Sequence, residues 1–169
     1  MPRTPAQAIG FLLGFWLAFA LSPLFVKTAA GAESSELAAF EADLLDQVNR
    51  IRDEHHLVLL VRRSDLDRVA LAHSIDMARR GYFSHLSPEG ANPLDRLQRH
   101  GVGDLRLAAE NLGKTTQADP STQIVESWLR SPEHRSNLLA PALNFTGIGI
   151  ARGADGSLIY TQVYIAVPR

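Results

Sequence analysis

Apolar residues recur at helical spacing in the first half of the chain. From Ser35 to about His56, six apolar positions return at steps of three and four residues, with charged residues between them: Leu37, Phe40, Leu44, Leu45, Val48 and Ile51. This spacing predicts an amphipathic helix with one buried face. A second helix is predicted from the N-cap residue Ser64 to Gly81, which is placed to end the helix in a left-handed conformation. His73 falls on its buried face, which predicts a core histidine bonded to a carbonyl or carboxylate.

Three shorter helices are predicted where a capping residue is followed by proline. The three pairs are Asn92-Pro93, Asp119-Pro120 and Ser131-Pro132. A side chain that caps the first turn, followed by a proline that needs no N–H partner, is typical of a helix start. Trp128 lies on the apolar stripe of the middle helix, which predicts a place in the core.

β-Branched and aromatic residues dominate the C-terminal part of the chain. They run from Phe145 to Ala151 and from Leu158 to Val167, separated by the turn sequence Gly153-Ala154-Asp155-Gly156, which predicts a hairpin. Another strand is predicted from Leu105 to Leu112, where Glu110 is a single acid among apolar residues. A charged side chain is seldom buried without a partner. Two glycines in the first hairpin strand, Gly147 and Gly149, predict a close approach between the sheet and a helix.

The N-terminal residues have the layout of a secretory signal. Arg3 precedes an apolar run from Ala8 to Val26, and the small residues Ala30-Gly31-Ala32 follow. We expect cleavage after Ala32. An uncleaved N-terminal anchor is the alternative, because the run is about long enough to span a bilayer. In both cases the rest of the chain is expected to work outside the cytoplasm, secreted or periplasmic.

Charge and cysteine content exclude several function classes. The chain has 17 basic and 18 acidic residues, and removal of residues 1–32 would leave 15 basic against 18 acidic. A mildly acidic domain lacks the positive surface that nucleic acid requires, so no nucleic-acid partner is expected. There is no cysteine, so neither disulfides nor thiolate chemistry can contribute.

Four short motifs together carry a family resemblance. They are Tyr-Phe-Ser-His-x-Ser-Pro-x-Gly at 82–90, Ala-Glu-Asn-Leu at 109–112, Trp-x-x-Ser-Pro-x-His-Arg-x-Asn-x-Leu at 128–139 and Tyr-Thr-Gln-Val at 160–163. In this order they resemble the bacterial SCP-like branch of the CAP superfamily, which includes cysteine-rich secretory proteins, antigen 5 and plant pathogenesis-related proteins. The resemblance implies an α+β fold, a three-layer α-β-α sandwich with a central antiparallel sheet and a cleft on one side. It covers residues 44–167, the predicted CAP domain, which a lead-in of the first helix at 33–43 joins to the signal peptide or anchor at 1–32.

The resemblance also implies a set of cleft residues. The family's cleft often holds two histidines and two glutamates, and the motifs place His85 and His134 at the histidine positions and Glu110 at the first glutamate position. In some members the histidines bind zinc or another divalent cation. His85 and His134 are therefore candidate metal ligands, with Zn²⁺ as the first candidate, since imidazole nitrogen is one of its usual ligands.

The second family glutamate is missing from its expected place. Ser131 stands at the motif position, and Glu126 and Glu133 are the nearby alternatives. The cation that follows in the same motif, Arg135, is expected to meet a carboxylate such as Glu89 or Asp95.

Three functions remain open at this point. The first is a binding module for a small or cell-envelope ligand such as a lipid, a glycan or a peptidoglycan fragment. The second is a metal-assisted hydrolase or protease in which Glu110 acts as base. The third is a pure protein-interaction module. The missing second glutamate favours binding over catalysis, so the expectation leans away from an enzyme. A membrane would be contacted only through an uncleaved N-terminal segment.

Overall fold

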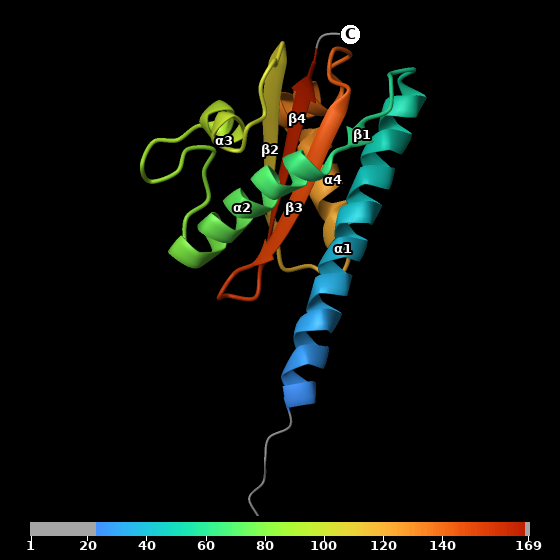
Figure 1. Ribbon diagram of the computed structural model, residues 1–169. Helices are drawn as coiled ribbons and strands as arrows, with labels where there is room; N and C mark the ends of the chain where they lie inside the picture. The colour runs from blue at the N-terminus through green and yellow to red at the C-terminus, as the bar shows by residue number, and fades with distance from the viewer. Residues whose placement is uncertain (1–22, 168–169) are drawn as a thin grey trace, which may run out of the picture.

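The computed structural model describes residues 23–167 of the chain (Figure 1). Its elements are α1 (Pro23–Glu54), β1 (Val61–Arg62), α2 (Ser64–Arg80), α3 (Pro93–Arg99), β2 (Leu107–Thr115), α4 (Pro120–Arg130), α5 (Pro132–Leu138), β3 (Phe145–Arg152) and β4 (Leu158–Ala166). Residues 1–22 of the predicted signal segment lie outside the described residues. Within residues 23–167, we find no helix with the length of apolar sequence that crossing a bilayer requires.

The four strands form one sheet in the order β1-β3-β4-β2. Strands β2, β3 and β4 pair antiparallel, and the two-residue β1 adds a parallel pair with β3. Helices α2 and α3 cover one face of the sheet, and α1, α4 and α5 cover the other (Figure 1). The predicted α-β-α sandwich is confirmed, with a sheet that is mixed because of β1. Strand β2 lies at an edge, with α3 beside it.

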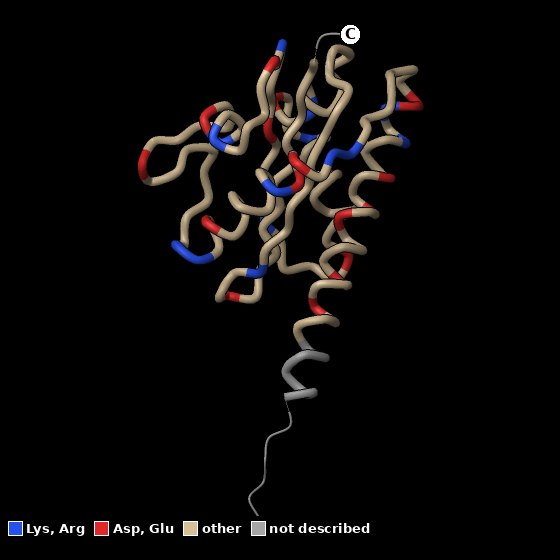
Figure 2. Tube along the Cα trace, in the orientation of Figure 1, with Lys and Arg blue, Asp and Glu red and all other residues tan. Residues whose placement is uncertain are grey.

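Helix α1 is longer than the apolar pattern predicts. It begins at Pro23 rather than near Ser35, and Ser35 bonds the carbonyl of Ala32 from inside the helix. Acidic residues lie along this helix (Figure 2). Two of them, Glu33 and Glu36, form ion pairs with Arg152 at the end of β3. The residues that directly follow the predicted cleavage site therefore already contact the domain.

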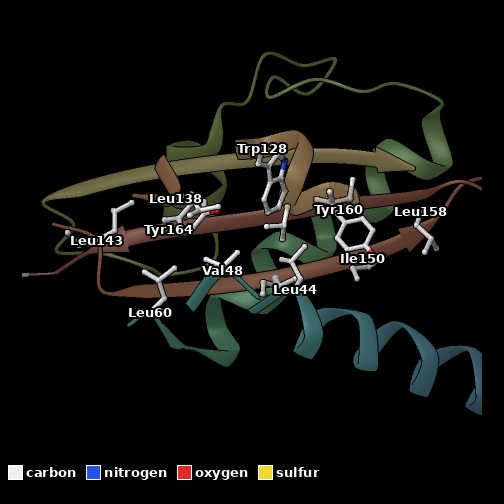
Figure 3. Close-up of a cluster of buried hydrophobic side chains, with 14 residues drawn as sticks. Leu44, Val48, Leu60, Trp128, Leu138, Leu143, Ile150, Leu158, Tyr160 and Tyr164 are labelled. Carbon is white, nitrogen blue, oxygen red and sulfur yellow. The ribbon is translucent and has the colours of Figure 1, made fainter. Parts of the chain in front are cut away.

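The larger core lies between the sheet and the layer of α1, α4 and α5 (Figure 3). Trp128 is buried there, as predicted, and its indole Nε1 donates a hydrogen bond of 2.7 Å to the carbonyl of Leu112. Tyr160 and Tyr164 enter the same core from β4. Burying an aromatic ring whose polar atom has a partner makes this contact between α4 and β2 both apolar and specific.

A buried arginine ties the same layer together. Arg52 of α1 has no exposed surface, and its guanidinium donates to the carbonyls of Val58, Leu138, Ala140 and Leu143. These carbonyls belong to the segment after α1, to the last residue of α5 and to the connection from α5 to β3. One side chain therefore satisfies chain segments that have no regular backbone partners of their own.

Gly81, Asn92, Asp119 and Ser131 hold the cap positions predicted for them, but the side chains of Asp119 and Ser131 make no cap hydrogen bond. Asn92 and Asp95 form a reciprocal capping box at α3, and Gly81 ends α2 with a φ of 69°. Ser64, in contrast, is the first residue of α2, and Arg63 holds the N-cap position. The Asp67 side chain accepts hydrogen bonds from Arg62 and from the backbone N–H of Ile148.

The predicted close approach at Gly147 and Gly149 is confirmed. A Cβ atom at either position would lie 2.1 Å from backbone atoms of α2, at Leu66 for Gly147 and at Leu71 for Gly149. Only glycine lets the helix rest this close to β3.

We expect Gly149→Ala to destabilise the domain by about 2 kcal/mol or more, because the added methyl group must push backbone away from backbone. Urea unfolding of the purified chain measures the loss. Gly103→Ala is the matched control, since a Cβ there meets nothing within 4 Å. Equal unfolding midpoints for the two variants would contradict the packing described here.

We expect Arg52→Met to lower the free energy of unfolding by at least about 3 kcal/mol, because several buried carbonyls lose a charged donor together. Arg50→Met on the exposed side of the same helix serves as the control and should change stability little. Similar losses in the two variants would show that the buried hydrogen bonds contribute nothing specific.

Candidate functional site

Glu110 of β2 is the centre of the candidate site. Its side chain is 1% exposed, and both carboxylate oxygens accept hydrogen bonds from Nη2 of Arg96, at 2.9 and 2.7 Å. The other terminal nitrogen of Arg96 donates to the carbonyls of His85 and Ala91. The buried acid predicted from the sequence therefore has a full charge partner, and the same arginine holds the loop that carries His85.

His85 receives its orientation from the same carboxylate. Its Nδ1 lies 2.9 Å from Oε1 of Glu110, and its side chain is 48% exposed. A carboxylate that is paired with arginine only accepts hydrogen bonds, so we assign the Nδ1 proton to His85. In the neutral ring this leaves Nε2 as a free acceptor or metal ligand at the surface.

His134 approaches from the opposite layer. Its ring centroid is 6.5 Å from that of His85, with the ring planes tilted by 48°. Burial lowers the pKa of His134, and the nearby His85 lowers it further, whereas the charge of Glu133 acts in the opposite direction. His134 is thus biased towards the neutral imidazole that binds metals and accepts hydrogen bonds.

Two asparagines hold the helix that carries His134. Nδ2 of Asn111 donates to the carbonyl of His134 at 3.0 Å, and Nδ2 of Asn137 donates to Oδ1 of Asn111 at 3.0 Å. Both amides therefore have a structural role. Successive strand residues face opposite sides of the sheet. Glu110 therefore positions His85 from one layer, and its neighbour Asn111 positions His134 from the other.

His73 is buried behind this arrangement, as predicted for a core histidine. Its Nε2 bonds the carbonyl of Ser84 at 3.0 Å and lies 4.0 Å from Oε1 of Glu110. Burial is the main cause that lowers the pKa of His73. A neutral His73 anchors the start of the His85 loop and leaves Arg96 as the charge partner of Glu110.

The sequence model of the Cysteine-rich secretory protein family, CAP, matches residues 45–164. The chain belongs to the CAP family. The uncharacterised protein YkwD of Bacillus subtilis is 36% identical over 139 residues, which cover 82% of this chain and 51% of YkwD. This CAP chain therefore spans about half the length of that relative.

Solved structures agree with this assignment. An extracellular protein containing an SCP domain from Bacillus anthracis has a TM-score of 0.68 at 34% identity, covering 88% of this chain and 45% of the other. An outer surface protein from Borrelia burgdorferi has a TM-score of 0.70 at 19% identity, covering 77% of this chain and 94% of the other, and shares the CAP fold.

Neither of the two alternatives for the second glutamate, Glu126 or Glu133, forms an ion pair with His85 or His134. Glu126 is exposed on α4 and pairs with Arg130, and Glu133 is exposed at the start of α5. Glu133 acts on His134 through its charge only. In the part of the chain that the structure describes, no three His, Asp or Glu residues are grouped to hold a metal ion.

Sequence reasoning missed Arg96 and misplaced Arg135. The signal for Arg96 was indirect, since a buried Glu110 demands a cation but the sequence does not say which one. The pairing of Arg135 with Glu89 or Asp95 was wrong. Glu89 forms its ion pair with Arg80, and Asp95 accepts from the backbone of Asn92.

We expect the pKa of His134 to rise in His85→Gln, because the substitution removes a nearby positive charge that lowers it. Glu133→Gln is the matched control of opposite sign and should lower the same pKa. Proton–nitrogen NMR titration of the imidazoles measures both. Shifts in the same direction in the two variants would contradict the electrostatics of the pair.

Proposed function

We propose that this CAP domain is an extracytoplasmic binding module whose ligand contacts His85 and His134. The predicted secretory signal and the description of the Bacillus anthracis relative as extracellular support this location. Outside the cytoplasm the available ligands include small and cell-envelope molecules, and we propose a lipid, a glycan or a peptidoglycan fragment as the ligand class.

The observation that carries the proposal is the ion pair in which Nη2 of Arg96 donates to both carboxylate oxygens of Glu110. A general base needs a lone pair that is free to reach water. Both oxygens of Glu110 are instead bonded to Arg96, one also to His85, and the carboxylate is 1% exposed. Glu110 is therefore better suited to position His85 than to activate water. This favours binding over the metal-assisted hydrolase.

The spacing of the His85 and His134 rings is compatible with a shared divalent transition metal, for which they would supply two ligands. Two imidazoles on one tetrahedral Zn²⁺ place their ring centroids about 5 Å apart, given a Zn–N distance of about 2.1 Å. The observed 6.5 Å is close to this value, and the half-exposed His85 ring has room to turn. We propose that His85 and His134 hold the metal when it is bound. With two protein ligands, open coordination positions would remain for a donor atom of the ligand.

We expect Zn²⁺ to bind the purified, chelator-treated chain at pH 7.5 in isothermal titration, and binding to be lost in His85→Ala/His134→Ala. Affinity should fall in acid, because protonated imidazole does not ligate metal, and the lowered pKa of His134 moves its protonation below the ordinary pH range of imidazole.

The matched control is His55→Ala/His56→Ala, which removes two exposed histidines at the end of α1 and should leave the isotherm unchanged. Zn²⁺ binding that survives loss of His85 and His134 would refute the metal site. If no Zn²⁺ binds the unmodified chain, the metal drops out of the proposal. Lipid and glycan binding, compared between the same variants, then tests what remains.

A further inference from the structure

The free edge of β2 is open over only part of its length. The carbonyls of Glu110 and Leu112 point away from β4, because they accept side-chain donors from Asn137 and Trp128 at 3.3 and 2.7 Å. In an antiparallel strand every second residue directs both its N–H and its C=O to the same side. Ala108 therefore also faces outward. Among residues 23–167, neither its backbone groups nor the N–H of Glu110 find a partner on that side.

A hollow of about 380 Å³ follows this open stretch. It is lined by Asn92, Pro93, Leu94, Leu105, Arg106, Leu107, Ala108 and Ala109. Successive strand side chains point to opposite faces. A hollow bordered by three successive residues of β2 must therefore lie along the edge of the strand, between it and the start of α3. Two small alanines leave the backbone accessible there.

Apolar and charged groups in the hollow define what would fill it. Leu94 and Leu107 are each 44% exposed and give apolar contact on either side of the edge. Arg106 is exposed, has no ion pair within the described residues, and is the one charged residue in the lining. Within residues 23–167, the hollow thus combines unpaired backbone groups, apolar contact and a free cation.

We propose that this edge binds an extended peptide, which adds to β2 as a short extra strand beside Ala108. Both backbone groups of Ala108 and the N–H of Glu110 would bond the peptide backbone. Leu94 and Leu107 favour an apolar or β-branched residue, and Arg106 favours an acidic one next to it. The capped carbonyls of Glu110 and Leu112 keep this ladder short. A short peptide therefore fits the edge better than the full β2 strand of a second copy.

This peptide site goes beyond the proposed function, and the two can fail separately. The hollow is not lined by His85 or His134. The probe is a phage-displayed library of random heptapeptides, selected on the full chain, with the enriched peptides then synthesised and measured by fluorescence anisotropy.

The diagnostic variant is Ala108→Pro. Proline is tolerated where an edge strand's N–H faces outward, but it removes that donor and blocks pairing. We expect at least about tenfold weaker peptide binding, the effect of losing one to two hydrogen bonds. Lys114→Pro is the matched control, because Lys114 faces outward on the same strand, beyond the capped carbonyls. It should bind the peptide normally, as should His85→Ala/His134→Ala. Arg106→Gln should weaken peptides that contain an acid.

A second measurement keeps the protein unmodified. The enriched peptide is N-methylated at alternate residues. Methylation in the register that faces β2 should abolish binding, and methylation in the other register should not. No enrichment, equal binding by Ala108→Pro, or indifference to the methylation register would overturn the proposal. Self-association of the chain that is lost in Ala108→Pro would also overturn it, in favour of a second copy at this edge.

Discussion

Burial of the Glu110 carboxylate is the constraint on which the site's side of the molecule depends. An ion of this kind is tolerated inside a protein only with a charge partner and a filled set of hydrogen bonds. Arg96 supplies the charge, and its Nη1 donates to the carbonyls of His85 and Ala91, whereas its buried Nε has no partner among the described residues. Compensation of one acid therefore places α3 beside β2, fixes the course of the loop at 82–91, and orients the His85 ring.

The layer of α1, α4 and α5 contains the opposite case, a buried positive charge. Arg52 is a buried cation that is compensated by carbonyl dipoles rather than by an acid. Those carbonyls lie at the end of α5 and in the irregular segments before β1 and β3, where the backbone lacks ladder partners. Two hydrogen bonds therefore hold α5, the helix that carries His134: Arg52 of α1 donates to its last carbonyl, and Asn111 of β2 donates to the carbonyl of His134. Both histidines are presented by short or irregular segments that a rigid interior positions.

Local signals in the sequence predicted the local structure well. Asn92 caps α3, Gly81 ends α2, and the turn at 153–156 closes the hairpin, because each depends on neighbours in the chain. Long-range partners were harder. That Glu110 needs a cation follows from its apolar surroundings. Its pairing with Arg96 depends on how α3 docks, which no local pattern encodes.

The other differences between prediction and structure have separate causes. Strand β1 exists only through its pairing with β3, and two residues leave no periodicity to recognise. The early start of α1 lies in an alanine-rich stretch without a strong stop signal. The motif positions of the CAP resemblance did bring His85, Glu110 and His134 to one place. They did not show that Arg96 already neutralises the glutamate.

Two consecutive residues of β2, Glu110 and Asn111, position the segments of both layers that carry the histidines, and this affects folding as well as binding. A slip of β2 by one residue against β4 would turn Glu110 towards α5 and Asn111 towards α3. Arg96 would then be buried without its acid, and the carbonyl of His134 would face a carboxylate in place of an amide. Misaligned sheets are thereby penalised by the same residues that present the histidines. Glu110 and Asn111 thus favour the correct alignment of β2 with β4. Substitution of either residue would therefore lower the yield of correctly folded chain, independently of any ligand.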